Sequence, residues 1–330
     1  MIRQYAEIDG KLVQTDVDIT ETKSVPHGIW IEVMAPTAPE IDWMKTTLSV
    51  PPEFLMSALD EEESAHIDSE EGAKLIVLDV PIYDTQKKSK NAYTTTPFAI
   101  IHTADHFITL CSQDTNLIKD VLSKNKKIEP HKKVRLTLQF LYRLASTYIS
   151  FLKKIDNQTR IVEKELQNSM RNKELFDLMD LNKSLVYFST AINANKVVIQ
   201  KMTRTPDFKQ YENDFSLLED TQIEIDQANE MCSIYRDILA GMMDAFASII
   251  SNNLNIVMKV LAIVTIVLSI PTLVASFYGM NFVNIPLAGT DYGFYIAVVG
   301  SFLLSVAGAI VLYRYTKRVK WFLIQFGRHR

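Results

Sequence analysis

Two long runs without a charged residue lie in the last quarter of the chain. The first extends from Val260 to Phe277 and the second from Tyr292 to Tyr313. As a helix, at about 1.5 Å per residue, either run can cross a hydrocarbon layer about 30 Å thick. The pattern predicts two membrane-spanning helices, at about 256–277 and 292–313. The alternative, a buried helical hairpin in a soluble core, is disfavoured because soluble helices rarely stay uncharged over this length.

Before these runs, hydrophobic positions recur with a helical period. Two long helices are predicted at 133–168 and 172–202, with a break at 205–207 that contains Pro206. A third helix is predicted from about Phe215 to Phe277, where it includes the first span. Its apolar positions follow a heptad rhythm, which predicts packing against other helices; they are Leu218, Ile225, Ala228, Cys232, Tyr235, Leu239, Met242, Phe246 and Ile249.

The first 125 residues or so show mixed patterns. Apolar runs predict strands at 28–34, 74–83, 97–103 and 106–112, the last two separated by a turn near Ala104 and Asp105. Pro39 and Pro51 open two predicted helices at 40–48 and 52–60, since proline and an acidic residue favour a helix start. The acidic segment 60–72 is predicted to be a solvated loop. The fold class is therefore α+β.

A second seam on the third helix is mostly polar. It consists of positions alternately four and three apart: Asp244, Ser248, Ser251, Asn255, Met258, Ala262, Thr265, Ser269, Thr272 and Ser276. Polar groups inside a bilayer must meet a partner or water, so this line predicts a wetted path enclosed by several copies of the helix. The alternative is that small hydroxyl residues only allow close helix packing. Ala297, Ser301, Ser305 and Ala309 make such a packing face on the second span.

Charge is distributed unevenly along the chain. Residues 256–330 carry a net charge of +6 and the residues before them −10, which together make the −4 of the whole chain. This acidic body argues against nucleic-acid binding, which needs a concentrated basic face. The loop between the spans has no Lys or Arg and a basic segment follows the second span, so both termini are expected in the cytoplasm. The amino end has no apolar run of signal-peptide length, which agrees with that placement.

Enzyme chemistry finds little support. His102 and His106 are four residues apart but fall on a turn between two strands, so paired metal ligation is improbable. Cys111 and Cys232 are far apart, and no disulfide framework or zinc knuckle is indicated. No Ser/His/Asp or Cys/His grouping and no nucleotide-binding GxxxxGK[ST] motif occurs. The chain is not expected to be an enzyme or to hold an organic cofactor.

The end of the first span carries the most specific motif, Tyr278–Gly279–Met280–Asn281. With two spans near the carboxy terminus, this YGMN sequence resembles the CorA family of divalent-cation channels. The resemblance implies a homopentamer in the plasma (inner) membrane, with a cytoplasmic αβα domain (1–130), a helical stalk or funnel (131–255), and a transmembrane domain with a short basic tail (256–330). Its partners would be other copies of itself, the lipid bilayer and divalent cations.

The resemblance also assigns roles to residues. It implies that Asn281 and the backbone of Gly279 and Met280 form the outer selectivity ring, and that a cytoplasmic Mg²⁺ site between subunits closes the channel. Asp220 resembles one carboxylate of that site, and the alternative is an ordinary solvated carboxylate on a helix. The partner position is Ser57, with Glu53 and Asp60 a turn away. Family pore positions carried over by the motif are Thr272, Leu261, Met258, Asn255 and, at the inner mouth, Asp244, which overlap the polar seam that also contains Thr265 and Ser269.

The expected function is passive influx of hydrated Mg²⁺, with Co²⁺ or Ni²⁺ as further ions. Magnesium would be both the transported ion and a regulator. Two alternatives stay open: a Zn²⁺ transporter of the same fold, and a membrane-anchored sensor or assembly that transports nothing. Neutral oxygens alone do not select one octahedral divalent ion.

Overall fold

The computed structural model describes residues 1–22, 24–70, 72–83, 93–125, 127–169, 172–209, 211–280, 286 and 290–327. The chain divides into two compact units, residues 1–243 and 244–330. Helix α6 (Glu212–Tyr278) belongs to both, because the boundary falls within it.

A seven-stranded mixed sheet forms the centre of the first unit. Its strands are β1 (Ile2–Ile8), β2 (Lys11–Asp16), β3 (Trp30–Met34), β4 (His66–Glu70), β5 (Ala73–Tyr83), β6 (Tyr93–His102) and β7 (Phe107–Cys111). They lie in the order β2-β1-β3-β7-β6-β5-β4. Only the β3–β7 pair among them is parallel. The predicted α+β class is confirmed.

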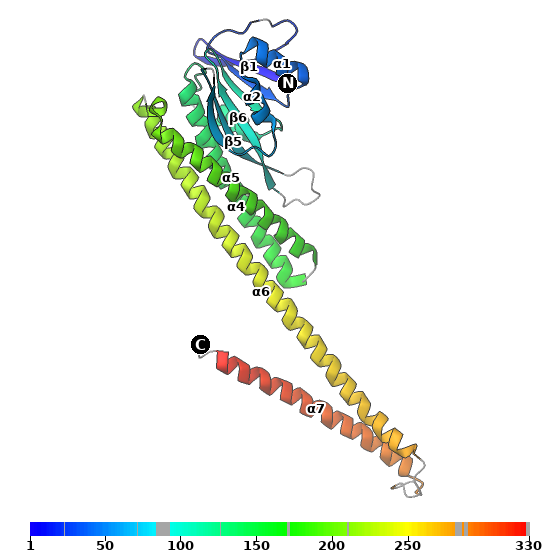
Figure 1. Cartoon of the computed structure of the whole chain (residues 1–330). Helices are drawn as coiled ribbons and strands as arrows, with labels where there is room; N and C mark the ends of the chain where they lie inside the picture. Colours follow the sequence, from blue (N-terminus) through cyan, green and yellow to red (C-terminus); the bar gives the residue numbers. More distant parts are fainter. Residues whose placement is uncertain are drawn as a thin grey trace. The chain divides into compact units, whose positions relative to one another are not determined.

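Helices cover both faces of this sheet (Figure 1). On one face, Ile31 and Val33 join a buried cluster with residues of α1 (Ala38–Thr47) and α2 (Pro52–Leu59). On the other face, Trp30 packs edge-on against Phe140 of α4 (Lys133–Ser169), with ring centroids 5.4 Å apart. Alternate side chains of a strand point to opposite faces, so β3 is buried on both sides. The unit is a three-layer αβα arrangement.

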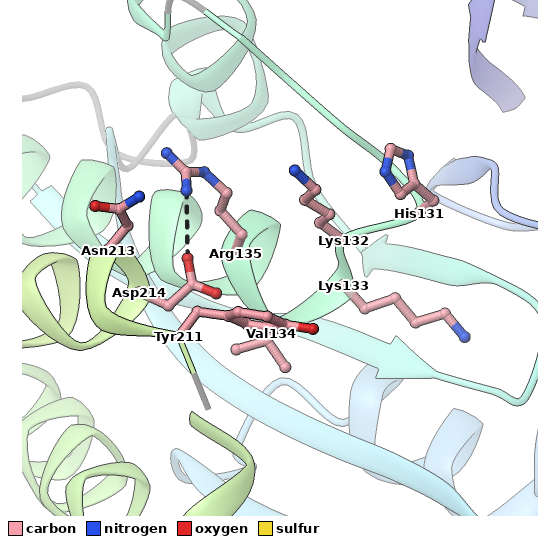
Figure 2. A pocket seen from close by; sticks show the side chains of 8 residues that line it. All are labelled: His131, Lys132, Lys133, Val134, Arg135, Tyr211, Asn213 and Asp214. Carbon is pink, nitrogen blue, oxygen red and sulfur yellow. Dashed lines mark ion pairs between the residues drawn. The ribbon is translucent and has the colours of Figure 1, made fainter. Parts of the chain in front are cut away.

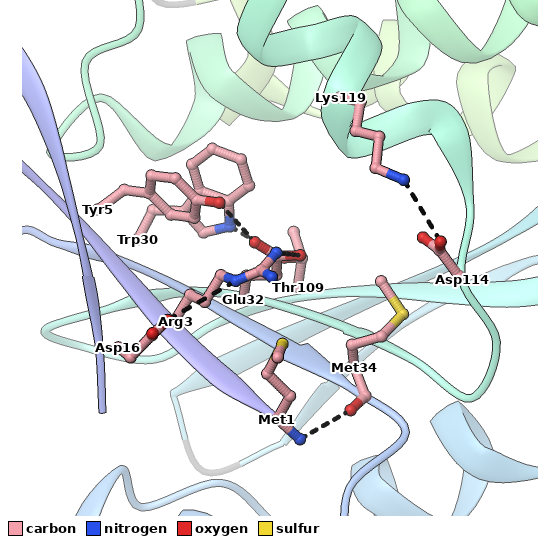
Figure 3. A network of polar contacts seen from close by, with 10 residues as sticks. All are labelled: Met1, Arg3, Tyr5, Asp16, Trp30, Glu32, Met34, Thr109, Asp114 and Lys119. Carbon is pink, nitrogen blue, oxygen red and sulfur yellow. Dashed lines mark hydrogen bonds and ion pairs between the residues drawn. The ribbon is translucent and has the colours of Figure 1, made fainter. Parts of the chain in front are cut away.

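The β1–β3 region also holds a buried polar network, drawn in Figure 3. The Tyr5 hydroxyl donates to Glu32 Oε2 at 2.6 Å, and the Trp30 Nε1–H donates to Thr109 Oγ1 at 2.9 Å. Arg3 lies 3.5 Å from the other Glu32 oxygen. Glu32 is only 3% exposed, so these partners are what makes its burial tolerable.

A proline interrupts the ladder between β5 and β6, where Asp79 faces Pro97. Proline has no N–H to give to the Asp79 carbonyl. Two helix side chains replace it: Tyr148 Oη and Asn195 Nδ2 each donate to that carbonyl at 2.8 Å. Asn195, which is fully buried, also accepts from the Asp79 N–H at 3.0 Å. These hydrogen bonds connect α4 and α5 to the sheet.

The long helices agree closely with the prediction. They are α4, α5 (Asn172–Arg204) and α6, with the short helix η1 (Pro206–Lys209) at the expected break. Within the first unit, the heptad seam of α6 is buried at Leu218, Ile225, Ala228, Cys232 and Leu239, as its period predicts.

Three parts of the prediction were wrong or incomplete. The acidic segment 60–72 is not only a loop, because its second half forms β4. Strands β1 and β2 and helix α3 (Asn116–Lys124) were not predicted. Strands β2 and β4 lie at the two edges of the sheet and are largely polar, so neither shows the hydrophobic run that would have predicted a strand.

Candidate functional site

The second unit contains a hairpin of α6 and α7 (Gly293–Gly327). Both helices contain segments long and apolar enough to cross a membrane, the second at Gly293–Arg314. One stripe of α6 is partly buried, whereas the residues around it are exposed; it is made of Ile263, Val267, Ile270, Pro271, Val274 and Tyr278. On α7 the buried positions include Ser301 and Ser305. A Cβ placed on Gly308 would lie 3.2 Å from Ile270 Cδ1, so α7 packs closely against this stripe.

The polar seam of α6 lies on the opposite side of that helix. At 3.6 residues per turn, the seam and the partly buried stripe differ in direction by about 180°. Every seam position from Asp244 to Ser276 is exposed within this chain. An open groove runs along it, lined by Thr265, Leu268, Ser269, Thr272, Leu273 and Ser276. The hydroxyl groups therefore do not serve to pack α6 against α7.

Three of these hydroxyls are oriented by their own helix. Thr265 donates to the Leu261 carbonyl at 2.9 Å, Ser269 to that of Ile266 at 2.8 Å, and Thr272 to that of Leu268 at 3.1 Å. Because each proton points to the backbone, each oxygen keeps its lone pairs as acceptors on the exposed side. A row of neutral acceptor oxygens suits the water shell of a hard cation.

The remaining pore candidates are also exposed on α6. Met258 is 59% and Leu261 58% exposed, and Asn255 and Asp244 lie further toward the amino end of the helix. Leu268 and Leu273, which line the groove, were not predicted as site residues. Their positions beside Thr265, Ser269 and Thr272 on the helical lattice could have indicated them.

The motif at the end of α6 is only partly described. The helix ends at Tyr278, the Gly279 N–H donates to the Ala275 carbonyl at 3.0 Å, and Met280 is 44% exposed. The Tyr278 hydroxyl donates to the Pro286 carbonyl at 3.0 Å, which links the helix end to the loop that follows. Asn281 lies outside the described residues.

The two proposed regulatory carboxylates, Asp220 on α6 and Asp60 after α2, are both exposed. Neither belongs to a group of three close metal-ligating side chains within the described part of this one chain, where Glu7, Glu129 and His131 form such a group. A site shared between subunits would not produce one.

A pocket of about 610 Å³ opens in the first unit where α4 and α6 begin. Figure 2 shows its lining, in which Arg135 reaches toward Asp214 with an N–O distance of 3.5 Å. Lys133 bonds the carbonyls of Thr103 and Ala104 at 2.6 and 2.7 Å. These basic groups already have partners and are committed to holding the start of α4.

Comparison with known proteins gives consistent results. A family model described as "CorA-like Mg2+ transporter protein" matches residues 27–318. The chain is 25% identical over 295 residues to the cobalt/magnesium transport protein CorA of Methanocaldococcus jannaschii, which covers 88% of this chain and 91% of that protein. It is 24% identical over 181 residues to the protein of the same name from Thermotoga maritima, covering 54% of this chain and 50% of that one.

The comparison of folds agrees with this result. The complete structure of the CorA magnesium transporter from Methanocaldococcus jannaschii superposes with a TM-score of 0.73. The two are 22% identical, and the match covers 96% of this chain and 98% of the other. Both chains therefore share one architecture over nearly their whole length.

Proposed function

Because this chain belongs to the CorA-like Mg²⁺ transporter family, we propose that it conducts Mg²⁺ passively across the plasma membrane along a path lined by the polar seam of α6. In this proposal five copies surround an axis, with α6 innermost and α7 outside. Magnesium is the substrate. The observation that carries the proposal is the exposed hydroxyl row on the side of α6 that α7 leaves uncovered.

The arrangement of the hairpin favours a shared path over simple packing. Ser301 and Ser305 on α7 are buried against α6, as expected of small residues that allow two helices to approach. Thr265, Ser269 and Thr272 have no such neighbour in the described part of the chain. In a bilayer, exposed polar side chains of this kind gain most by facing water.

The chemistry fits an ion that keeps its water. Magnesium dehydrates reluctantly, so neutral oxygens can accept hydrogen bonds from its bound waters without replacing them. A divalent ion moving down a membrane potential gains about 4.6 kcal/mol per 100 mV, twice the value for one charge. No hydrolysis of a nucleotide is then required.

The proposed path has an outer end, a constriction and an inner mouth. Gly279, Met280 and Asn281 form the outer ring, and Asp244 attracts cations at the cytoplasmic mouth. Met258 and Leu261 are large apolar side chains between these ends, on the inner side of the hydroxyl row, and they close the path by excluding water in the resting state. Both termini lie in the cytoplasm in this arrangement.

We further propose that cytoplasmic Mg²⁺ closes the channel through Asp220 of one subunit and Asp60 of its neighbour. Both side chains are exposed carboxylates, and oxygen ligands of this type suit Mg²⁺. Loss of either charge should leave a channel that closes less completely at high internal Mg²⁺.

Ion flux into reconstituted vesicles tests the proposal. With a membrane potential, inside negative, the wild-type chain should admit Mg²⁺, and Asn281→Ala should abolish selective entry. Asn284→Ala is a matched control in the same loop and should conduct normally. The same vesicles, assayed with Co²⁺, Ni²⁺ and Zn²⁺, rank the transported ions. Absence of Mg²⁺ flux at every potential would refute the proposal.

The constriction has its own test. Met258→Gly should increase Mg²⁺ leak through the resting channel, because it removes an apolar side chain that is 59% exposed in the single chain. Unchanged resting flux in this variant would exclude Met258 from the gate.

A further inference from the structure

Three metal-ligating side chains converge in the first unit. One ligand atom from each of Glu7, Glu129 and His131 lies within 4.8 Å of the others. The His131 Nδ1 and Glu7 Oε2 atoms are 3.6 Å apart, beyond a good hydrogen bond. The Glu129 side chain is 9% exposed and that of Glu7 24%, so the two carboxylates are partly withdrawn from water.

The backbone holds these side chains in place. Glu7 lies near the end of β1. Glu129 and His131 share one tight turn, which the Lys132 N–H closes by donating to the Glu129 carbonyl at 3.0 Å. Pro130 occupies the second position of this turn, where its fixed φ is favoured. The cluster therefore joins the sheet to the segment that leads into α4.

The distances suit a tetrahedral metal ion. Metal–ligand bonds of about 2.0–2.1 Å place two ligands about 3.4 Å apart in a tetrahedron, close to the observed 3.6 Å between His131 and Glu7. An imidazole nitrogen with two carboxylates favours Zn²⁺ and similar ions over Mg²⁺, which prefers oxygen ligands alone. His131 is 54% exposed, so a water can enter as the fourth ligand.

Two lysines contact one of the three cluster side chains, Glu129. Lys127 and Lys132 both contact the same oxygen of Glu129, Oε1, at 2.8 and 3.0 Å. Figure 2 shows the Lys132 and His131 side chains extending in different directions from the segment just before α4. Hydrogen bonds of this kind orient a carboxylate ligand. Their positive charges also weaken binding, which suits a reversible site.

We propose that Glu7, Glu129 and His131 bind one Zn²⁺-class ion per chain, with water completing the coordination. The site is separate from the proposed conduction path, and its existence does not depend on Mg²⁺ transport. An occupied site would link the end of β1 to the linker before α4.

Zinc binding to the purified full-length protein in detergent tests this inference. Equilibrium dialysis against ZnCl₂ with excess MgCl₂, which saturates oxygen-only sites, should give one bound Zn²⁺ per chain. His131→Ala should weaken this binding at least about 10-fold, since even removing a residue that only supports a ligand costs 10–100-fold. Glu129→Gln and Glu7→Gln should each weaken it similarly. Thermal melting of each variant without metal establishes that it is folded.

His66→Ala is the matched control. His66 also lies 3.5 Å from a carboxylate, that of Glu63, but these two have no third ligand of this type within reach among the described residues. The control should bind Zn²⁺ as the wild type does. Equal binding by wild type and His131→Ala, an equal loss in His66→Ala, or no Zn²⁺ bound by the wild type would each overturn the proposal.

Discussion

The orientation of the hydroxyl row can be tested with two serines that differ in little except the face they occupy. Ser269 lies on the exposed seam of α6 and donates to the carbonyl three residues earlier at 2.8 Å. Ser301 lies on α7, is 8% exposed, and makes the same kind of bond, also at 2.8 Å. Changing each to alanine removes the same group from an equivalent helical setting.

The expected loss follows from the oxygen that each change removes. A hydrogen bond contributes about 0.5–1.5 kcal/mol net, so one lost acceptor costs roughly two- to tenfold in the affinity of a passing hydrated ion. In a ring of five chains the losses add to about 2.5–7.5 kcal/mol if the ion's waters contact every copy, and even the lower value is about 60-fold at 1.4 kcal/mol per tenfold. We expect Ser269→Ala to reduce Mg²⁺ conductance at least about 10-fold.

Ser301→Ala should leave conductance unchanged and alter only stability. The assay is Mg²⁺ flux into vesicles containing equal amounts of folded protein, measured at several potentials. Wild-type conductance in Ser269→Ala would refute the reasoning, because the seam would then face lipid or another helix. Equal losses in both variants would refute it too, since the effect would come from the hairpin's stability.

Three further predictions concern stability, measured by thermal unfolding of the detergent-solubilised chain. Gly308→Val should destabilise the hairpin by about 1–3 kcal/mol, because even a Cβ at this position lies 3.2 Å from Ile270 Cδ1. Gly300→Val is the control and should have little effect, because a Cβ there meets nothing within 4 Å. Equal melting temperatures of the two variants would contradict this packing. Burial raises the pKa of Asp79 from 3.8 to about 6, so the stability that the protonated carboxyl contributes below pH 4 is lost as pH rises through about 6. Asp79→Asn should therefore increase the free energy of unfolding by up to about 3 kcal/mol at pH 7 and leave it unchanged at pH 4. An increase that does not vary with pH would show that it does not come from the Asp79 charge. Asn195→Leu should lower the free energy of unfolding by about 2–4 kcal/mol, because the Asp79 N–H loses its hydrogen-bond partner. An unchanged melting temperature would show that the strand does not need this hydrogen bond.

Local pattern was sufficient for the long helices and for the two segments that are long and apolar enough to cross a membrane. A helix buries residues that recur every three or four positions, so α4, α5 and α6 could be located from sequence almost to their ends. Strands buried on both faces, such as β5 and β6, were found from their apolar runs. The edge strands β2 and β4 were missed because backbone hydrogen bonds to a neighbouring strand hold each in place. Such bonds leave no mark on the composition of the strand.

For the candidate site, too, the sequence predicted some features and the structure decided others. Spacing alone placed Thr265, Ser269 and Thr272 on one line, and the YGMN motif at 278–281 indicated the family. Spacing could not decide whether that line faces α7, because the angle between two helices depends on contacts such as that of Gly308 with Ile270. The structure decided it by placing α7 on the opposite side of α6.

The sequence by itself determined the two candidate spans, the heptad seam of α6 and the chemical character of its polar line, since each is a property of residues close together in the chain. Only the tertiary structure decided which groups meet from far apart. Asn195 hydrogen-bonds to the Asp79 backbone opposite Pro97, and Glu7 lies close to Glu129 and His131. Folding brings together these backbone segments, which have no sequence pattern in common. Such meetings depend on the packing of whole layers, which no local period encodes.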